Sequence, residues 1–90
     1  MRVEGEAVIC NESGLHARPC HAVVSLALAH ASELRVACGE REVNGKSILE
    51  LMTLGASKGT TLRFSADGSD AEALVAALVS LVESGFSGVS

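Results

Sequence analysis

The chain has 90 residues, is 48% hydrophobic and carries a formal net charge of −4, as expected for a single globular domain with a modest core. It contains two Phe and no Trp or Tyr, so stacking on nucleic-acid bases has little support. The acidic balance also argues against binding a phosphate backbone. We therefore expect residues 1–90 to form one domain with no nucleic-acid partner.

Cysteine usage and the N-terminal residues indicate the compartment. Cys10, Cys20 and Cys38 are an odd set without a close pair, which favours reduced thiols over a disulfide framework. They do not have the spacing of a structural zinc site. No apolar run follows Met1 as in a secretory signal, and none approaches the roughly 20 residues needed to span a bilayer. These features predict a cytoplasmic protein without membrane insertion.

The first two predicted elements are a strand and a helix. Residues 2–9 alternate between apolar and charged or polar positions, which predicts a strand with one solvated face. Turn-forming residues follow at Asn11, Ser13 and Gly14. From Ala17 to about His30 the apolar residues recur at helical spacing, and Pro19 is tolerated only in a first turn. The helix is therefore expected to begin close to Ala17.

A hairpin and a short helix are expected next. Residues 33–38 alternate in polarity, 39–40 form a turn, and 41–43 give a short partner strand. Residues 47–50 have the form of a capping box, with Ser47 as the N-cap and Glu50 reaching back to it. The helix from about Ile48 to Thr53, ended by Gly55, is too short for Ile48, Leu49 and Met52 all to face the core. An exposed apolar patch is expected there.

The last part of the chain predicts a strand and a long helix. Residues 60–66 alternate in polarity, 67–68 turn, and 69–72 look like a second capping box. An apolar stripe from Ala71 to Val82 predicts a helix that Gly85 ends, and residues 87–90 are expected to fray. The order β-α-β-β-α-β-α, with helices covering the apolar sheet face, predicts a two-layer α+β domain.

The start of the first helix carries the chemistry. His16 falls at or next to the N-cap, where the unpaired N–H groups of Ala17 and Arg18 favour an anion. Arg18 adds a guanidinium suited to phosphate, and a neutral imidazole is nucleophilic near pH 7. A histidine at such a position is also compatible with a plain solvated cap. A small hydrolase is disfavoured, since the sequence places no second nucleophile or carboxylate beside His16.

Two blocks of sequence resemble one known family. Residues 14–19, Gly-Leu-His-Ala-Arg-Pro, look like the active-site motif of HPr, the histidine-containing phosphocarrier of the bacterial phosphotransferase system. Residues 44–55, from Asn44 to Gly55, resemble the regulatory serine region of that family. The resemblance covers essentially the whole chain. It implies an antiparallel four-stranded sheet with three helices on one side.

The resemblance also implies a function. Enzyme I, charged from phosphoenolpyruvate, would phosphorylate the pros nitrogen of His16, and the group would pass to IIA-type proteins. Arg18 and the N–H of Ala17 would stabilise the phosphoryl group. Such a protein is a carrier rather than an enzyme, and needs no cofactor or metal. A carrier that docks two partners in turn through one face is expected to be a monomer.

Regulation and docking follow from the same resemblance. An HPr kinase/phosphorylase would modify Ser47, although a plain N-cap explains that serine equally well. The docking surface would include Cys20, His21, Ile48, Leu49 and Met52. Cys20 has two further interpretations: a small apolar filler, or a redox-sensitive thiol whose pKa the helix N-terminus lowers.

Two alternatives to a sugar-uptake carrier remain. Basic residues frequent on the first helix of this family are replaced here by Ser25 and Leu28. That departure favours a nitrogen-type regulatory carrier without a transport role, whereas the Ser47 block favours the sugar type. A regulatory binding module with the same shape and no relay duty is the other alternative, and the presence of both His16 and Arg18 argues against it.

Overall fold

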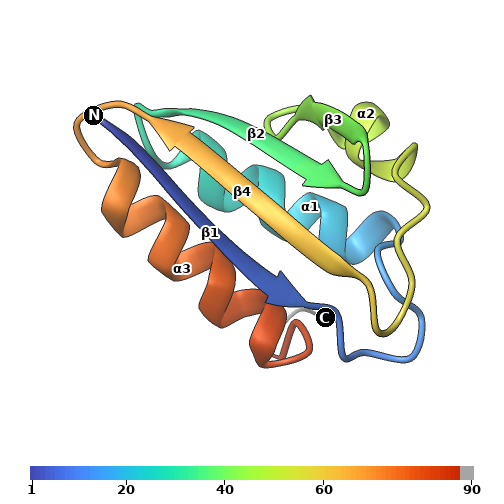
Figure 1. The fold of residues 1–90 in the computed structure, drawn as a ribbon. Coiled ribbons are helices and arrows are strands. Elements are labelled where there is room, and N and C mark those ends of the chain that lie inside the picture. Colours follow the sequence, from blue (N-terminus) through green and yellow to red (C-terminus); the bar gives the residue numbers. More distant parts are fainter. Residues whose placement is uncertain (88–90) are drawn as a thin grey trace.

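A computed structural model describes residues 1–87, which form four strands and three helices in the order β-α-β-β-α-β-α (Figure 1). The strands are β1 (Arg2–Val8), β2 (Glu33–Cys38), β3 (Arg41–Asn44) and β4 (Thr61–Asp67). The helices are α1 (Ala17–Leu28), α2 (Ile48–Met52) and α3 (Ala71–Glu83). The predicted order is confirmed. α1 ends at Leu28 rather than His30, and the fraying expected at the C-terminus concerns mainly residues 88–90, which lie outside the described residues.

The strands form one antiparallel sheet in the order β1-β4-β2-β3. The first and last strands of the chain therefore pair, with Arg2 opposite Asp67 and Val8 opposite Thr61. One face of the sheet is covered by α1 and α3, which run behind it in Figure 1, and α2 lies beside β3 and the start of α1. The predicted two-layer α+β domain is confirmed.

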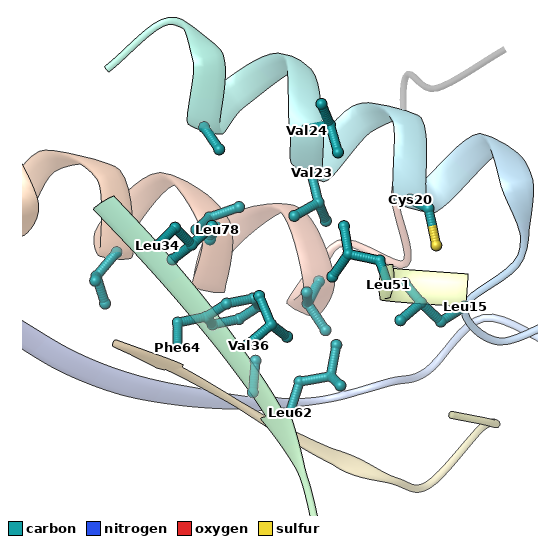
Figure 2. Packing of buried hydrophobic residues seen from close by; sticks show 14 of the residues in the cluster. Leu15, Cys20, Val23, Val24, Leu34, Val36, Leu51, Leu62, Phe64 and Leu78 are labelled. Carbon is teal, nitrogen blue, oxygen red and sulfur yellow. The ribbon is translucent and has the colours of Figure 1, made fainter. Parts of the chain in front are cut away.

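The core lies between the sheet and the helices. Alternate residues of β2 and β4, including Leu34, Val36, Leu62 and Phe64, point to the helices and are almost fully buried (Figure 2). Burying each aliphatic side chain contributes about 1.5–3 kcal/mol. The helical stripes predicted from the sequence meet them, with Val23 and Ala27 from α1 and Leu74, Leu78 and Val82 from α3.

The capping box predicted at α2 is half right. The Oγ of Ser47 accepts the N–H of Glu50 at 3.2 Å, so Ser47 is the N-cap. The Glu50 carboxylate, however, accepts the N–H of Asn44 at 3.0 Å instead of the N–H of Ser47, which donates to the Asn44 carbonyl. Glu50 thereby fastens α2 to the end of β3.

The second predicted capping box, at residues 69–72, is wrong. Asp70 is the N-cap of α3, and its side chain makes no bond to the helix it begins. Its carboxylate accepts the N–H groups of Ala31 and Ser32, at 2.8 and 3.0 Å, and the hydroxyl of the fully buried Ser32. These donors, the Ser32 hydroxyl foremost, lower the pKa of Asp70 to about 2. The carboxylate thus ties the α1–β2 connection to α3.

Candidate functional site

His16 occupies the N-cap of α1. Its backbone is extended (φ −110°, ψ −166°) and its carbonyl accepts the N–H of Cys20 at 3.0 Å, the first bond of the helix. The imidazole makes no capping bond and is exposed. The ring is therefore not committed to the helix and is open to a partner molecule.

The helix begins here because of Pro19. Proline lacks an N–H and fits the first turn, where that N–H would have no intrahelical partner. Within residues 1–87, the N–H groups of Ala17 and Arg18 have no acceptor in the protein. They carry part of the positive end of the helix dipole and lie beside His16. These two N–H groups are free to receive an acceptor, and their role in binding an anion stays a prediction.

The loop before His16 is anchored to the segment between α2 and β4. The N–H of Leu15 donates to the Ala56 carbonyl at 2.9 Å, and the Leu15 side chain is buried. Gly14 has φ +66°, and a Cβ added there would stand 2.6 Å from the same carbonyl oxygen, so the position admits only glycine without a backbone shift. The backbone leading to His16 is thereby held in a defined path.

A shallow pocket of about 180 Å³ adjoins the helix start. It is lined by Asn11, His16, Arg18, Pro19, Gly85 and Phe86. The exposed Arg18 side chain therefore shares one hollow with the imidazole. Larger depressions, of about 340 and 420 Å³, lie on the uncovered face of the sheet between long charged side chains such as Arg2, Arg35 and Glu42. They contain neither His16 nor a helix terminus, so we place the site at the smaller pocket.

Sequence reasoning missed the contribution of the C-terminal turn. The N–H groups of Gly85 and Phe86 donate to the carbonyls of Val82 and Leu81, which ends α3 as predicted. Phe86 itself has φ +60°, rare for a bulky residue, and its ring is buried. Gly85 gave a signal for the end of the helix, but only the folded chain brings that end beside residue 16.

Cys20 does not belong to a docking surface. Its exposed fraction is 0%, and Figure 2 shows it on the same side of α1 as Val23, with its sulfur directed toward Leu15 and Leu51. Burial raises the pKa of the Cys20 thiol from 9.0 to about 11. The predicted partner contact and the lowered pKa are both wrong, and the apolar-filler interpretation holds.

The other predicted surface residues are accessible to different degrees. His21 is exposed one turn into α1, and Leu49 and Met52 of α2 are 80% and 45% exposed. Ile48 and the N-cap Ser47 are half-buried, and α2 packs against α1 and β3. The expected apolar patch therefore exists, centred on Leu49 and Met52. Its role in docking stays a prediction.

Residues 1–87 offer neither a cluster of metal ligands nor a membrane-spanning helix. No group of three or more His, Cys, Asp or Glu side chains there is placed to share a metal ion. None of the helices in this part of the chain is long and apolar enough to cross a membrane.

Comparison with known proteins decides the family. Residues 3–84 match the family model described as "PTS HPr component phosphorylation site". The chain belongs to the HPr family. It is 38% identical over 82 residues to the phosphocarrier protein HPr of Borreliella burgdorferi, covering 91% of this chain and 95% of the relative. It is also 33% identical over 85 residues to the phosphocarrier protein NPr of Shewanella violacea, covering 94% and 93%.

Solved structures of the family agree. HPr from Thermoanaerobacter tengcongensis superposes with a TM-score of 0.88 at 42% identity, over 93% of this chain and 94% of that one. The family resemblance and the fold inferred from the sequence are therefore confirmed, and membership implies a phosphocarrier role within a phosphotransferase system.

Proposed function

We propose that this member of the HPr family relays a phosphoryl group through a phosphohistidine at His16, taking it from phosphoenolpyruvate-charged enzyme I and giving it to IIA-type proteins. The observation that carries the proposal is the helix start, where an uncommitted imidazole shares a pocket with Arg18 and stands beside two N–H groups that have no acceptor within residues 1–87. The protein is a carrier that is consumed and regenerated, not an enzyme, and it acts in the cytoplasm.

Phosphoryl transfer at this site gives the neutral side chain of His16 a negatively charged phosphoryl group. A nitrogen lone pair of the neutral imidazole attacks phosphorus while the bond to the previous carrier breaks. The phosphoryl oxygens then meet the N–H groups of Ala17 and Arg18 and the Arg18 guanidinium, which stabilise negative charge. Because these donors are already in place, little reorganisation is needed when the group arrives.

Intact mass spectrometry tests the relay. The protein is incubated with phosphoenolpyruvate, Mg²⁺ and an enzyme I from the same organism. Wild type should gain the mass of one phosphate in an acid-labile bond, and His16→Ala should gain nothing. His30→Ala, which removes a histidine that lies beyond the end of α1 and outside the proposed docking surface, is the control and should behave as wild type. No gain in wild type would reject the relay.

A nitrogen-type carrier is the second candidate. The similarity to an NPr supports it, as does α1, which carries no basic residue in its last turn and exposes Ser25 and Leu28. Rates of transfer from the phosphorylated protein to a sugar-type and to a nitrogen-type IIA protein would distinguish the two. Preference for the nitrogen-type acceptor would assign the chain to the regulatory branch.

The docking surface in this proposal comprises His21, Ile48, Leu49 and Met52, next to the start of α1. An exposed apolar patch beside a reactive side chain is typical of a contact surface. If the patch were essential to the biological role while His16 was dispensable, a regulatory binding module without relay duty would be the better description. We further propose that the protein is a monomer, which light scattering with size-exclusion chromatography would test.

Ser47 is proposed as a regulatory phosphorylation site for an HPr kinase/phosphorylase. A phosphate at a helix N-terminus is tolerated by the helix, so its main effect would be negative charge beside the Leu49 and Met52 patch. Incubation with such a kinase and ATP, followed by peptide mapping, tests this. Absence of modification at Ser47 would leave it a plain N-cap.

A further inference from the structure

Within residues 1–87, one buried polar atom of the site has no hydrogen-bond partner. Among the side-chain nitrogen and oxygen atoms buried in residues 1–87, the Oδ1 of Asn11 alone makes no hydrogen bond. The Nδ2 of the same amide donates to the Gly14 carbonyl at 2.8 Å. That bond fixes which way the amide faces, because the reversed orientation would bring two oxygens together.

Asn11 also clamps the loop that leads to His16. Its backbone carbonyl accepts the N–H of Gly14 at 3.2 Å, so the two residues exchange bonds in both directions. With Nδ2 used in this way, the remaining function of the side chain lies in Oδ1. Buried acceptors without a donor oppose folding and are scarce in native proteins, so the Asn11 Oδ1 is available to accept a further hydrogen bond.

The pocket limits the choice of donor. Of the side chains that line it with Asn11, only His16 and Arg18 have an N–H, since the others belong to Pro19, Gly85 and Phe86. Phosphoryl oxygens are acceptors and cannot satisfy Oδ1. In the complex with the phosphoryl donor, as in the phosphorylated state, the Arg18 guanidinium is drawn to the phosphoryl group. The N–H of the His16 ring remains.

We propose that Asn11 is a positioning residue, whose Oδ1 accepts the N–H of the His16 imidazole nitrogen that does not take the phosphoryl group. The inference rests on the proposed phosphoryl transfer at His16. The bond holds the ring in one tautomer, which leaves the lone pair on the other nitrogen to attack phosphorus. The bond from phosphorus to the previous carrier's histidine breaks, and its electron pair returns to that nitrogen. On onward transfer the electron pair of the P–N bond returns to the His16 nitrogen. The other ring nitrogen keeps its proton, which stays hydrogen-bonded to the Asn11 Oδ1 throughout.

Two substitutions at Asn11 separate the loop contact made by its Nδ2 from the acceptor function of its Oδ1. Asn11→Ala removes both the Nδ2 donor and Oδ1, whereas Asn11→Asp replaces the Nδ2 donor by a second oxygen, adds a negative charge and keeps an acceptor. Ser13→Ala is the matched control, in the same loop, exposed and outside the pocket. Long-range ¹H–¹⁵N NMR of the imidazole reports the tautomer, and thermal unfolding reports whether each variant folds.

We expect one dominant tautomer in wild type, Ser13→Ala and Asn11→Asp, and a mixture like that of free imidazole in Asn11→Ala. The rate of phosphoryl transfer onto Asn11→Ala should fall about fivefold, as for loss of one neutral hydrogen bond. A wild-type tautomer in Asn11→Ala, or a mixture in both Asn11 variants, would overturn the inference. The tautomer is measured without phosphorylation, so failure of the relay in wild type is a separate outcome.

Discussion

The three thiols of the chain differ in exposure, and this gives a prediction at the scale of single residues. Cys10 is exposed, Cys38 is half-buried and Cys20 is fully buried. The rise in the pKa of Cys20 from 9.0 to about 11 leaves about a hundredfold less thiolate at pH 8 than an unshifted thiol would have. Brief treatment of the folded protein with iodoacetamide should modify Cys10 first and leave Cys20 unmodified until denaturant is added. Peptide mapping reports the order, and early labelling of Cys20 would contradict the buried position.

The wrong assignment of Cys20 shows how far the exposure of a single side chain can be predicted from the sequence. Its spacing to Val23, Val24 and Ala27 already placed it on the buried face of α1, and all four are buried. Its assignment to a docking surface came from the family resemblance, whereas the helical spacing of its own neighbours indicated the buried face correctly. The expectation that Ile48, Leu49 and Met52 could not all face the core was correct, because a five-residue helix cannot bury every apolar side chain, and the exposed members are Leu49 and Met52.

At the scale of elements, the cap of α2 gives the next prediction. Ser47→Ala removes the acceptor for the N–H of Glu50 and should lower the free energy of unfolding by about 1 kcal/mol. Urea titration measures the change. Ser57→Ala, at an exposed serine outside any helix or strand, should shift stability by less than about 0.5 kcal/mol. Equal stabilities of the two variants would show that the cap bond contributes nothing measurable.

The limits of the sequence are clearest at helix starts. A capping box is a local sequence pattern. At residues 69–72 the pattern is present, but the N-cap side chain makes no hydrogen bond to the N–H groups of the helix. Asp70 instead bonds Ala31 and Ser32, which are 39 and 38 positions away in the chain. Glu50 likewise bonds Asn44, at the end of β3. Local propensity located both helices correctly, whereas the partners of their acidic side chains depend on the tertiary fold.

At the scale of the whole molecule, periodicity and capping patterns predicted every element and their order, and the family resemblance supplied the antiparallel sheet. Alternation alone does not say that β1 pairs with β4 or that β4 lies between β1 and β2. That topology places the turn after α3 beside the start of α1, and so brings Phe86 to the pocket of His16. The site was predictable where it is local, at residues 16–18, and not where it depends on the crossing of distant elements.

The contacts of Asp70 join the α1–β2 connection to α3, so its ionisation should affect the stability of the whole domain. The pKa of this carboxyl falls from 3.8 to about 2 on folding, because the Ser32 hydroxyl and the N–H groups of Ala31 and Ser32 favour the charged form. The folded state therefore binds the proton more weakly than the unfolded state does. The resulting stability is fully present above about pH 4 and is lost as the pH falls toward 2.

Asp70→Asn tests this linkage. The amide keeps one acceptor but has no charge, so the variant should be less stable than wild type at pH 7 and should lose less stability between pH 4 and pH 2. Urea unfolding at several pH values measures both effects. Asp67→Asn is the control, since Asp67 is exposed and, within residues 1–87, its carboxylate pairs only with the N-terminal amine at 3.5 Å. If the two variants had the same pH dependence, the bonds of Asp70 would not couple protonation to the stability of the fold.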